Sequence, residues 1–127
     1  MGTDIYTIVE VQDEGGAWRV PEPWCNSRHL DADLGRSYDL FALLAGVCGE
    51  PDPIIEPRGL PTDLSPLGRR FFRVPDNPWH HSTSWWTLAE LDAVPVWPDV
   101  GTWWPDFLAK LRTLGPPDRV RIVFGFD

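Results

Sequence analysis

Residues 80–94 read HHSTSWWTLAELDAV, a stretch that combines two histidines, a run of hydroxyl side chains, paired tryptophans and a marked helix start. Thr87 and Glu90 have the spacing of a capping box, in which the side chain of each residue accepts a hydrogen bond from the backbone N–H of the other. Trp86 and Leu91 flank this box at the positions of a hydrophobic staple. The pattern therefore predicts a short helix that begins directly after Thr87.

The residues before the tryptophan pair, His80 to Ser84, are predicted to form a loop that is held rigidly against the start of this helix. Backbone N–H groups and the helix dipole favour an anion at such a position. The serine hydroxyls add donors, although hydroxyls in a loop more often cap its own backbone. This stretch is the first candidate site, with the side chains of His81, Ser82, Ser84 and Trp85.

The whole chain of 127 residues fits one globular domain, residues 1–127, with a single core. Its eight tryptophans and 14 prolines are the unusual feature of its composition. Tryptophan often lies at recognition surfaces with one edge in water. In a small domain broken by prolines, however, it more often fills the wide gaps between short elements.

The net charge of −8 limits the partners that the protein can take. A groove that tracks phosphates needs clustered lysines and arginines, and the 11 present here are mostly dispersed, so direct binding of nucleic acid is not expected. The acidity suits a basic partner protein, or it simply keeps the protein in solution.

Cys25 and Cys48 match neither a disulfide framework nor a zinc pattern. The N-terminus does not resemble a signal peptide, and no apolar run approaches the roughly 18 residues that a membrane span needs. We therefore expect a cytoplasmic protein with reduced thiols and no membrane contact.

Two segments alternate apolar and polar residues with the period of a β-strand. Residues 4–12 (DIYTIVEVQ) are followed by a turn at residues 13–16 and a short return strand at residues 17–20, which together predict a hairpin. Residues 119–127 (RVRIVFGFD) are apolar on both faces in their middle, so this strand is expected in the centre of the sheet.

Two further helices are expected. Ser37 or Asp39 can cap a helix through residues 40–47, which is apolar almost all round and would be buried, with Gly49 as its stop. Thr102 can cap a later helix. The buried face of that helix is predicted to carry Trp104, Phe107, Leu108 and Leu111.

Residues 50–78 are rich in proline and are predicted to form a long ordered loop, because apolar residues such as Ile54 and Phe72 can anchor it. Ordered loops of this length usually carry function. The predicted fold class is α+β. It is a small, mainly antiparallel sheet built from an N-terminal hairpin and a C-terminal strand, with about three helices on one face and the Pro-rich loop across one end.

Arg58 lies in the loop segment EPRGLP, where prolines stiffen the turn and glycine lets the backbone approach a ligand. A guanidinium held on such a turn suits a phosphate or a carboxylate. Arg36 and Arg121 are further candidates for the same anion. The alternative is that Arg58 pairs with Glu56 or Asp63 and only fixes the loop.

A metal site can be drawn from His29, Asp31 and Asp33, which would share one face of a strand and could combine with His80 or His81. The spacing matches no recognised ligand motif, and solvated loop residues are the better interpretation. Neither a metal nor another cofactor is therefore expected.

His81 is the candidate for acid–base chemistry, with Asp4, Glu10 or Asp39 as a carboxylate partner. The serines beside His81 are weak candidates for a nucleophile, because catalytic triads are assembled from distant segments and no Gly-x-Ser-x-Gly motif is present.

Asp127 would lie near Asp4 or Glu10, depending on strand direction, if the last strand neighbours the first one. Such carboxylates more often pair with an arginine, for which Arg36 and Arg121 are available.

Five segments, in a fixed order over nearly the whole chain, carry a resemblance to a known family. They are GTDIY (2–6), R-x-YDLFA-x-LAGV (36–47), EPRGLP (56–61), HS-x-SW-x-TL (81–88) and RIVF-x-FD (121–127). Together they resemble small proteins of phages, prophages and bacteria whose typical opening is Gly-Cys-Asp-Ile-His. That family has no settled activity, so the resemblance implies no mechanism.

Thr3 and Tyr6 stand where the family opening has Cys and His. If those two residues belong to a metal or catalytic site in relatives, the resemblance implies that this chain has lost it. The residues that do match coincide with the loops selected above on physical grounds: Glu56, Arg58, His81, Ser82, Ser84 and Asp127.

These observations favour a phage-type accessory protein for host interaction or anti-defence, acting in the host cytoplasm, that binds a small anionic, nucleotide-like ligand. Its binding residues are expected to be Arg36, Arg58, His81, Ser82, Ser84 and Trp85. One alternative is a hydrolase or other enzyme acting on such a ligand, with His81 as acid or base. The other is an acidic, Trp-rich protein that binds and inhibits a host protein without pocket chemistry.

Overall fold

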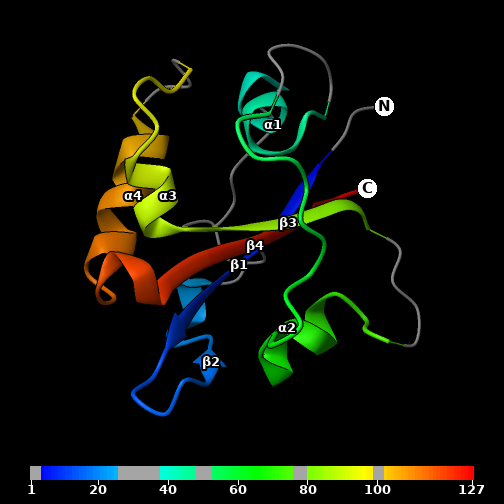
Figure 1. Cartoon of the computed structure of the whole chain (residues 1–127), viewed down its shortest axis with the longest axis vertical. Coiled ribbons are helices and arrows are strands. Elements are labelled where there is room, and N and C mark those ends of the chain that lie inside the picture. The colour runs from blue at the N-terminus through cyan, green and yellow to red at the C-terminus, as the bar shows by residue number, and fades with distance from the viewer. Residues whose placement is uncertain (1–3, 26–37, 48–52, 76–79, 99–101) are drawn as a thin grey trace.

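The computed structural model describes residues 4–25, 38–47, 53–75, 80–98 and 102–127. It confirms the α+β class with one four-stranded antiparallel sheet and helices packed against it (Figure 1). The spatial order of the strands is β2 (Trp18–Arg19), β1 (Ile5–Gln12), β4 (Val120–Phe126) and β3 (His81–Thr87).

The C-terminal strand β4 lies in the centre of the sheet, as its apolar character on both faces predicts. It pairs with β1 from Ile5 opposite Phe126 to Val11 opposite Val120, and with β3 on its other side. Every residue of β4 is buried. The predicted N-terminal hairpin is also present, with Val11 opposite Arg19.

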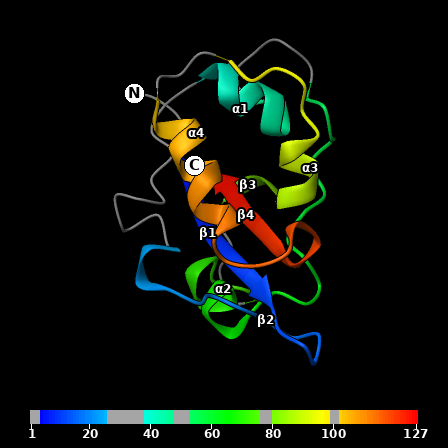
Figure 2. The ribbon, with the colours of Figure 1, turned by 90° about the vertical axis from the view of Figure 1, so that its left-hand side faces the viewer.

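Three helices cover one face of the sheet: α1 (Tyr38–Ala45), α3 (Leu88–Asp92) and α4 (Trp103–Arg112) (Figures 1 and 2). Their apolar side chains form the main core with those of β1, β3 and β4. The predicted inner face of α4 is confirmed, since Trp104, Phe107, Leu108 and Leu111 are all buried. Within the described residues, no helix has the length and apolar character to cross a membrane.

The buried helix predicted over residues 40–47 is confirmed as α1, but it ends earlier than predicted. Gly46 takes a left-handed φ of +71° and its N–H donates to the Ala42 carbonyl at 2.8 Å, which closes the helix there. Asp39 lies inside the first turn and does not cap it. Ser37 and Gly49, the other predicted end residues, lie outside the described part of the chain.

A fourth helix, α2 (Pro66–Phe71), lies within the Pro-rich segment that was predicted as loop throughout. Ser65 caps it, accepting from the Gly68 N–H at 3.0 Å, and Pro66 occupies its first turn, where a missing N–H does no harm. It covers the opposite face of the sheet, over a second small core of Ile8, Leu64, Phe72 and Val123. The expectation of helices on one face alone is therefore wrong.

The stretch predicted as a loop before α3 is the edge strand β3. The capping box that follows it is confirmed: the Thr87 hydroxyl accepts from the Glu90 N–H at 3.2 Å, and the Glu90 carboxylate accepts from the Thr87 N–H at 3.0 Å. Trp86 and Leu91, the predicted staple, are fully buried in the main core. Short 3-10 turns at Pro23–Cys25 and Pro117–Arg119 complete the described elements.

Candidate functional site

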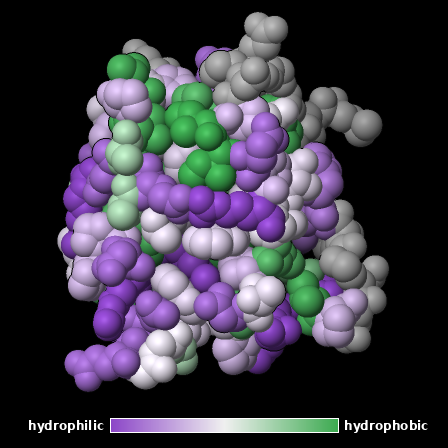
Figure 3. All heavy atoms as spheres, viewed as in Figure 1, coloured by the Kyte–Doolittle hydropathy of each residue, from purple (hydrophilic) through white to green (hydrophobic). Residues whose placement is uncertain are grey.

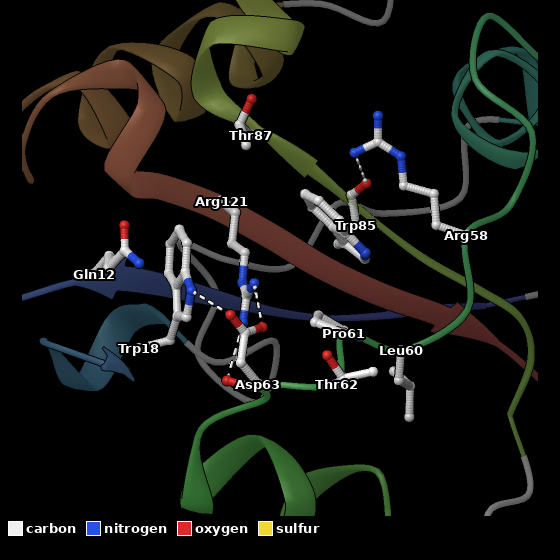
Figure 4. Close-up of a pocket in the computed structure, with 10 residues that line it drawn as sticks. All are labelled: Gln12, Trp18, Arg58, Leu60, Pro61, Thr62, Asp63, Trp85, Thr87 and Arg121. Atoms are coloured by element: carbon white, nitrogen blue, oxygen red, sulfur yellow. Dashed lines mark hydrogen bonds and ion pairs between the residues drawn. The ribbon is translucent and has the colours of Figure 1, made fainter. Parts of the chain in front are cut away.

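A cleft of about 530 Å³ opens on the face of the sheet that α2 covers (Figure 4). Its walls come from the ends of the strands and from the segment that leads into α2, residues 58–63. The side chains that give it chemical character are Trp18, Arg58, Asp63, Trp85 and Arg121.

The floor of the cleft rests on a buried ion pair. Glu10 and Arg121 lie directly opposite on β1 and β4, and the Arg121 Nε donates to Glu10 Oε1 at 2.8 Å. Their side chains are 0% and 3% exposed. The other Glu10 oxygen accepts from the Ser65 N–H at 2.8 Å. The prediction that such an acid pairs with Arg36 or Arg121 is confirmed for Glu10 and Arg121.

The guanidinium of Arg121 also contacts Asp63 and Trp18 at the rim of the cleft. Its Nη1 donates to Asp63 Oδ1 at 3.0 Å, and the Trp18 indole N–H donates to Asp63 Oδ2 at 3.0 Å. The guanidinium carbon lies 3.8 Å from the centroid of the Trp18 ring, a cation–π distance. Asp63, whose side chain is 60% exposed, is thus oriented by two donors while it faces solvent.

Arg58 is held by a different carboxylate from the two that were expected. Its Nη1 donates to Glu90 Oε1 at 2.9 Å and to the Trp85 carbonyl at 3.2 Å, and its Nη2 pairs with Glu90 Oε2. The guanidinium carbon lies 4.3 Å from the Trp85 ring centroid. The prediction that Glu56 or Asp63 pairs with Arg58 is therefore wrong, because Asp63 pairs with Arg121 and Glu90 pairs with Arg58.

Glu90 joins the cleft to the helix cap. Burial acts to raise the pKa of its carboxyl, but hydrogen bonds from Arg58 and Thr87 and the charge of Arg58 outweigh burial, so that its pKa lies below its usual value. The carboxylate therefore stays charged and keeps Arg58 in place at neutral pH.

The two arginines alternate with two tryptophans across the cleft. Arg121 lies over Trp18 and 5.7 Å from Trp85, and Arg58 lies over Trp85 (Figure 4). Stacking on an indole fixes the plane of a guanidinium as well as its position. Both guanidinium groups are therefore held in fixed orientations.

Ser84, predicted to bind ligand, is fully buried behind Arg58. Its hydroxyl accepts from the Arg58 backbone N–H at 3.0 Å, and the Gly59 N–H donates to the Thr83 carbonyl at 2.8 Å. Gly59 has a φ of +79°, which glycine adopts without strain. Ser84 thus fixes the turn that presents Arg58 and does not line the cleft.

A β-bulge separates His81 from the cleft. His81 lies opposite Phe126 and Ser84 opposite Phe124, so β3 carries one extra residue there, with Ser82 at a left-handed φ of +51°. Residues directly opposite in a sheet share a face. His81 consequently shares the main-core side with Ser84, whereas Trp85 lies on the cleft side.

His81 instead belongs to a polar cluster near the end of the chain. Its Nε2 lies 2.8 Å from the Asp127 carbonyl oxygen and its Nδ1 lies 3.0 Å from Ser82 Oγ. Because a carbonyl only accepts, Nε2 carries a proton, and in the neutral imidazole Nδ1 then accepts from the Ser82 hydroxyl. The Asp127 carboxylate accepts from the Tyr6 hydroxyl at 3.1 Å and from the Asp4 N–H at 2.8 Å. Of the two expected neighbours of Asp127, the antiparallel pairing of β1 and β4 thus brings Asp4 next to it.

His80 lies beside this cluster but on the α2 side. Its ring packs against Tyr6 at 4.8 Å and Phe72 at 5.3 Å between centroids. Burial lowers the pKa of His80, so its imidazole is neutral at pH 7. Gly125 makes this packing possible, since a Cβ there would lie 2.9 Å from the His80 Cβ.

Five candidates remain to be placed. Arg36, His29, Asp31 and Asp33 lie outside the described residues, and Asp39 is exposed on α1. Among the residues that the structure does describe, no three His, Cys, Asp or Glu side chains are grouped as metal ligands would be. No family model matches the chain, and no curated protein or solved structure is significantly similar to it.

Proposed function

We propose that the protein binds a small anionic, nucleotide-like ligand in the cleft beside Arg58. The observation that carries this proposal is a guanidinium that is fixed from three sides and still has one edge open. Glu90 takes one hydrogen each from Nη1 and Nη2, and the Trp85 carbonyl takes the second Nη1 hydrogen.

The open edge of Arg58 consists of its Nε–H and the second Nη2 hydrogen. Within the described part of the chain, Nε makes no hydrogen bond. These two donors are parallel and match two oxygens of a phosphate or a carboxylate. Since Arg58 is already held by Glu90 and stacked on Trp85, little side-chain entropy is lost when an anion binds.

The size and walls of the cleft suit a ligand of mononucleotide size. Its volume of about 530 Å³ lies within the range of ordinary small-molecule sites, which is about 300–1,000 Å³. The half-buried Trp85 offers an aromatic edge for a ring to pack against, and Gln12, Thr62 and Asp63 supply polar groups. The further role as a phage-type accessory protein in host interaction or anti-defence is supported by the order of the five resembling segments.

Calorimetric titration of the purified protein with nucleotides and cyclic nucleotides tests this proposal. Arg58→Ala should weaken binding about 10- to 100-fold, as loss of a charge-assisted bidentate contact does. Arg112→Ala is the matched control, because it removes another arginine–carboxylate pair, with Asp92, outside the cleft. Equal affinity of the wild type and Arg58→Ala would overturn the assignment of the site.

A second candidate function is hydrolysis at the polar cluster. Ser82, His81 and the Asp127 carbonyl form a chain of hydrogen bonds in the order nucleophile, base and orienting group. In that reaction Ser82 Oγ would attack an electrophilic carbon or phosphorus while His81 Nδ1 takes its proton. His81 would then give that proton to the leaving group as the bond between the leaving group and the attacked atom breaks, and water would later release the group held on Ser82. The backbone carbonyl of Asp127 would take the place of the carboxylate expected from Asp4, Glu10 or Asp39.

A fluorophosphonate probe tests the hydrolase directly, because the serine oxygen displaces fluoride from phosphorus and stays labelled. Labelling of the wild type that is lost in both Ser82→Ala and His81→Ala supports the hydrolase. An unlabelled wild type, or labelling that survives in Ser82→Ala, contradicts it.

The third interpretation, docking through a Trp-rich surface, draws little support from the described tryptophans. Trp86 and Trp104 are fully buried, and Trp97 and Trp103 pack against the main core. Figure 3 shows hydrophobic side chains gathered in the upper part of one face. Among the residues whose burial is described, the exposed large apolar side chains are those of Ile54, Leu67 and Val96, and none of these is a tryptophan.

A further inference from the structure

Ion pairing leaves the cleft with no excess of positive charge. Arg58 is paired with Glu90, and Arg121 is shared between Glu10 and Asp63. Two guanidinium groups against three carboxylates leave one negative charge. A bound anion is therefore attracted by the open edge of Arg58, while each additional negative charge on the ligand is opposed by the site as a whole.

Asp63, at the other end of the cleft, offers hydrogen-bond acceptors, whereas Arg58 offers hydrogen-bond donors. Asp63 has each carboxylate oxygen engaged by one described donor, Arg121 Nη1 on Oδ1 and Trp18 Nε1 on Oδ2. A carboxylate oxygen accepts two hydrogen bonds, so each retains room for another. With 60% of its side chain exposed and its direction fixed, Asp63 can read a hydrogen-bond donor on a ligand (Figure 4).

Trp85 lies between these two ends. Its ring centroid is 4.3 Å from the guanidinium carbon of Arg58 and 5.7 Å from that of Arg121, which holds Asp63. A ligand that contacts both Arg58 and the carboxylate held by Arg121 therefore passes alongside the Trp85 ring. A nucleoside with its phosphate at Arg58 and its base toward Asp63 would lie along that ring.

We infer that the cleft selects a nucleotide with a single negative charge and an amino group on its base, which is the chemistry of a phosphodiester of an amino-bearing nucleoside. This inference rests on the proposed function and makes Asp63 the residue that determines base specificity. Asp63 accepts from the exocyclic amino group, and Arg58 donates to the phosphodiester oxygens.

Calorimetry with three probes tests it on the whole chain. Adenosine 3′,5′-cyclic monophosphate has the singly charged phosphodiester and the amino group. Purine riboside 3′,5′-cyclic monophosphate differs by lacking that amino group. Adenosine triphosphate keeps the base but carries several charges. Each probe is titrated into the wild type, Asp63→Asn, Arg58→Ala and the control Arg112→Ala, with the melting temperature of each variant measured alongside.

The wild type should prefer the amino-bearing cyclic nucleotide over its deamino analogue by at least about tenfold, because the analogue leaves a charged acceptor without its donor. Asp63→Asn should reduce that preference to about two- to threefold while affinity for the deamino analogue stays within the same factor. Adenosine triphosphate should bind more weakly than the cyclic nucleotide.

Two results would overturn this inference and leave the proposed function standing. One is Arg58-dependent binding with equal affinity for the two cyclic nucleotides. The other is tighter binding of adenosine triphosphate than of the cyclic nucleotide. If none of the probes binds in an Arg58-dependent way, the proposed nucleotide site fails, and the assignment of Asp63 fails with it.

Discussion

Glu10 and Arg121 face each other across β1 and β4 and form an ion pair whose two side chains are withdrawn from water. The same arginine extends to Asp63 and stacks on Trp18 at the cleft. The centre of the sheet and the floor of the candidate site are therefore one network, so that changes in this pair affect both stability and the shape of the cleft.

Arg121→Met should lower the free energy of unfolding by about 3–5 kcal/mol, because it leaves the Glu10 carboxylate buried without its counter-ion. The double variant Glu10→Leu/Arg121→Met should recover most of that loss, since neither charge is then buried. Urea unfolding of the wild type, both single variants and the double variant measures the coupling. If the two single effects simply add, the pair is not coupled as the structure shows it.

Thr87→Ala should destabilise the protein by about 0.5–2 kcal/mol, because the α3 cap loses its acceptor for the Glu90 N–H. Thr102→Ala is the matched control. Thr102 holds the same position at the start of α4 but makes no side-chain cap hydrogen bond, so its replacement should change stability by less than about 0.5 kcal/mol. Equal losses from the two variants would show that the hydroxyl of Thr87 contributes nothing specific.

The free energy of unfolding should decrease as the pH is lowered through the titration of Glu90. Its pKa in the folded protein lies below the reference value of 4.5, so its contribution is fully present above that value and is lost as pH falls through the lower folded pKa. Free energies of unfolding measured from about pH 6 to about pH 3 should decline less in Glu90→Gln than in the wild type. Parallel curves for the two proteins would contradict this role of Glu90.

Gly125→Ala should destabilise the protein by about 1–3 kcal/mol through overpacking. The added Cβ would lie 2.9 Å from the His80 Cβ and 3.0 Å from the Thr83 Cγ2, and neither atom is the far end of a flexible chain. Gly115→Ala serves as the control, since its Cβ would meet no atom closer than 3.8 Å. Similar melting temperatures for the two variants would mean that His80 does not pack over Gly125.

The sequence was most informative where local chemistry alone decides structure. The α3 capping box, the apolar face of α4 and the central position of β4 all follow from spacing and periodicity, and all are present. The start of α2 also had a local signal, since Ser65 followed by Pro66 is a common helix entry. It was hidden among the many prolines around it.

The candidate site was less predictable because its contacts join residues far apart in the sequence. Arg58 could be selected as a cation on a stiff turn, but its partner Glu90 had already been assigned to the helix cap. The Glu90 carboxylate both completes the capping box and pairs with Arg58, and the second contact depends on tertiary packing. Sequence reasoning gives Asp63 only as a possible partner of Arg58 and does not single out Trp18 for the site, because the contacts of both residues at the cleft depend on tertiary packing around Asp63 and Arg121.

The extra residue in β3 makes His80 and His81 chemically unequal, although they are neighbours in the chain. Side chains alternate between the faces of a strand, so one inserted residue moves every side chain that precedes it in the strand to the opposite face of the sheet. Removing a single residue between His81 and Ser84 would exchange the two histidines, placing His81 against Tyr6 and His80 over the main core. A length change of one residue, at a position outside the cleft, would thereby exchange the surroundings of the two imidazoles without substituting either histidine.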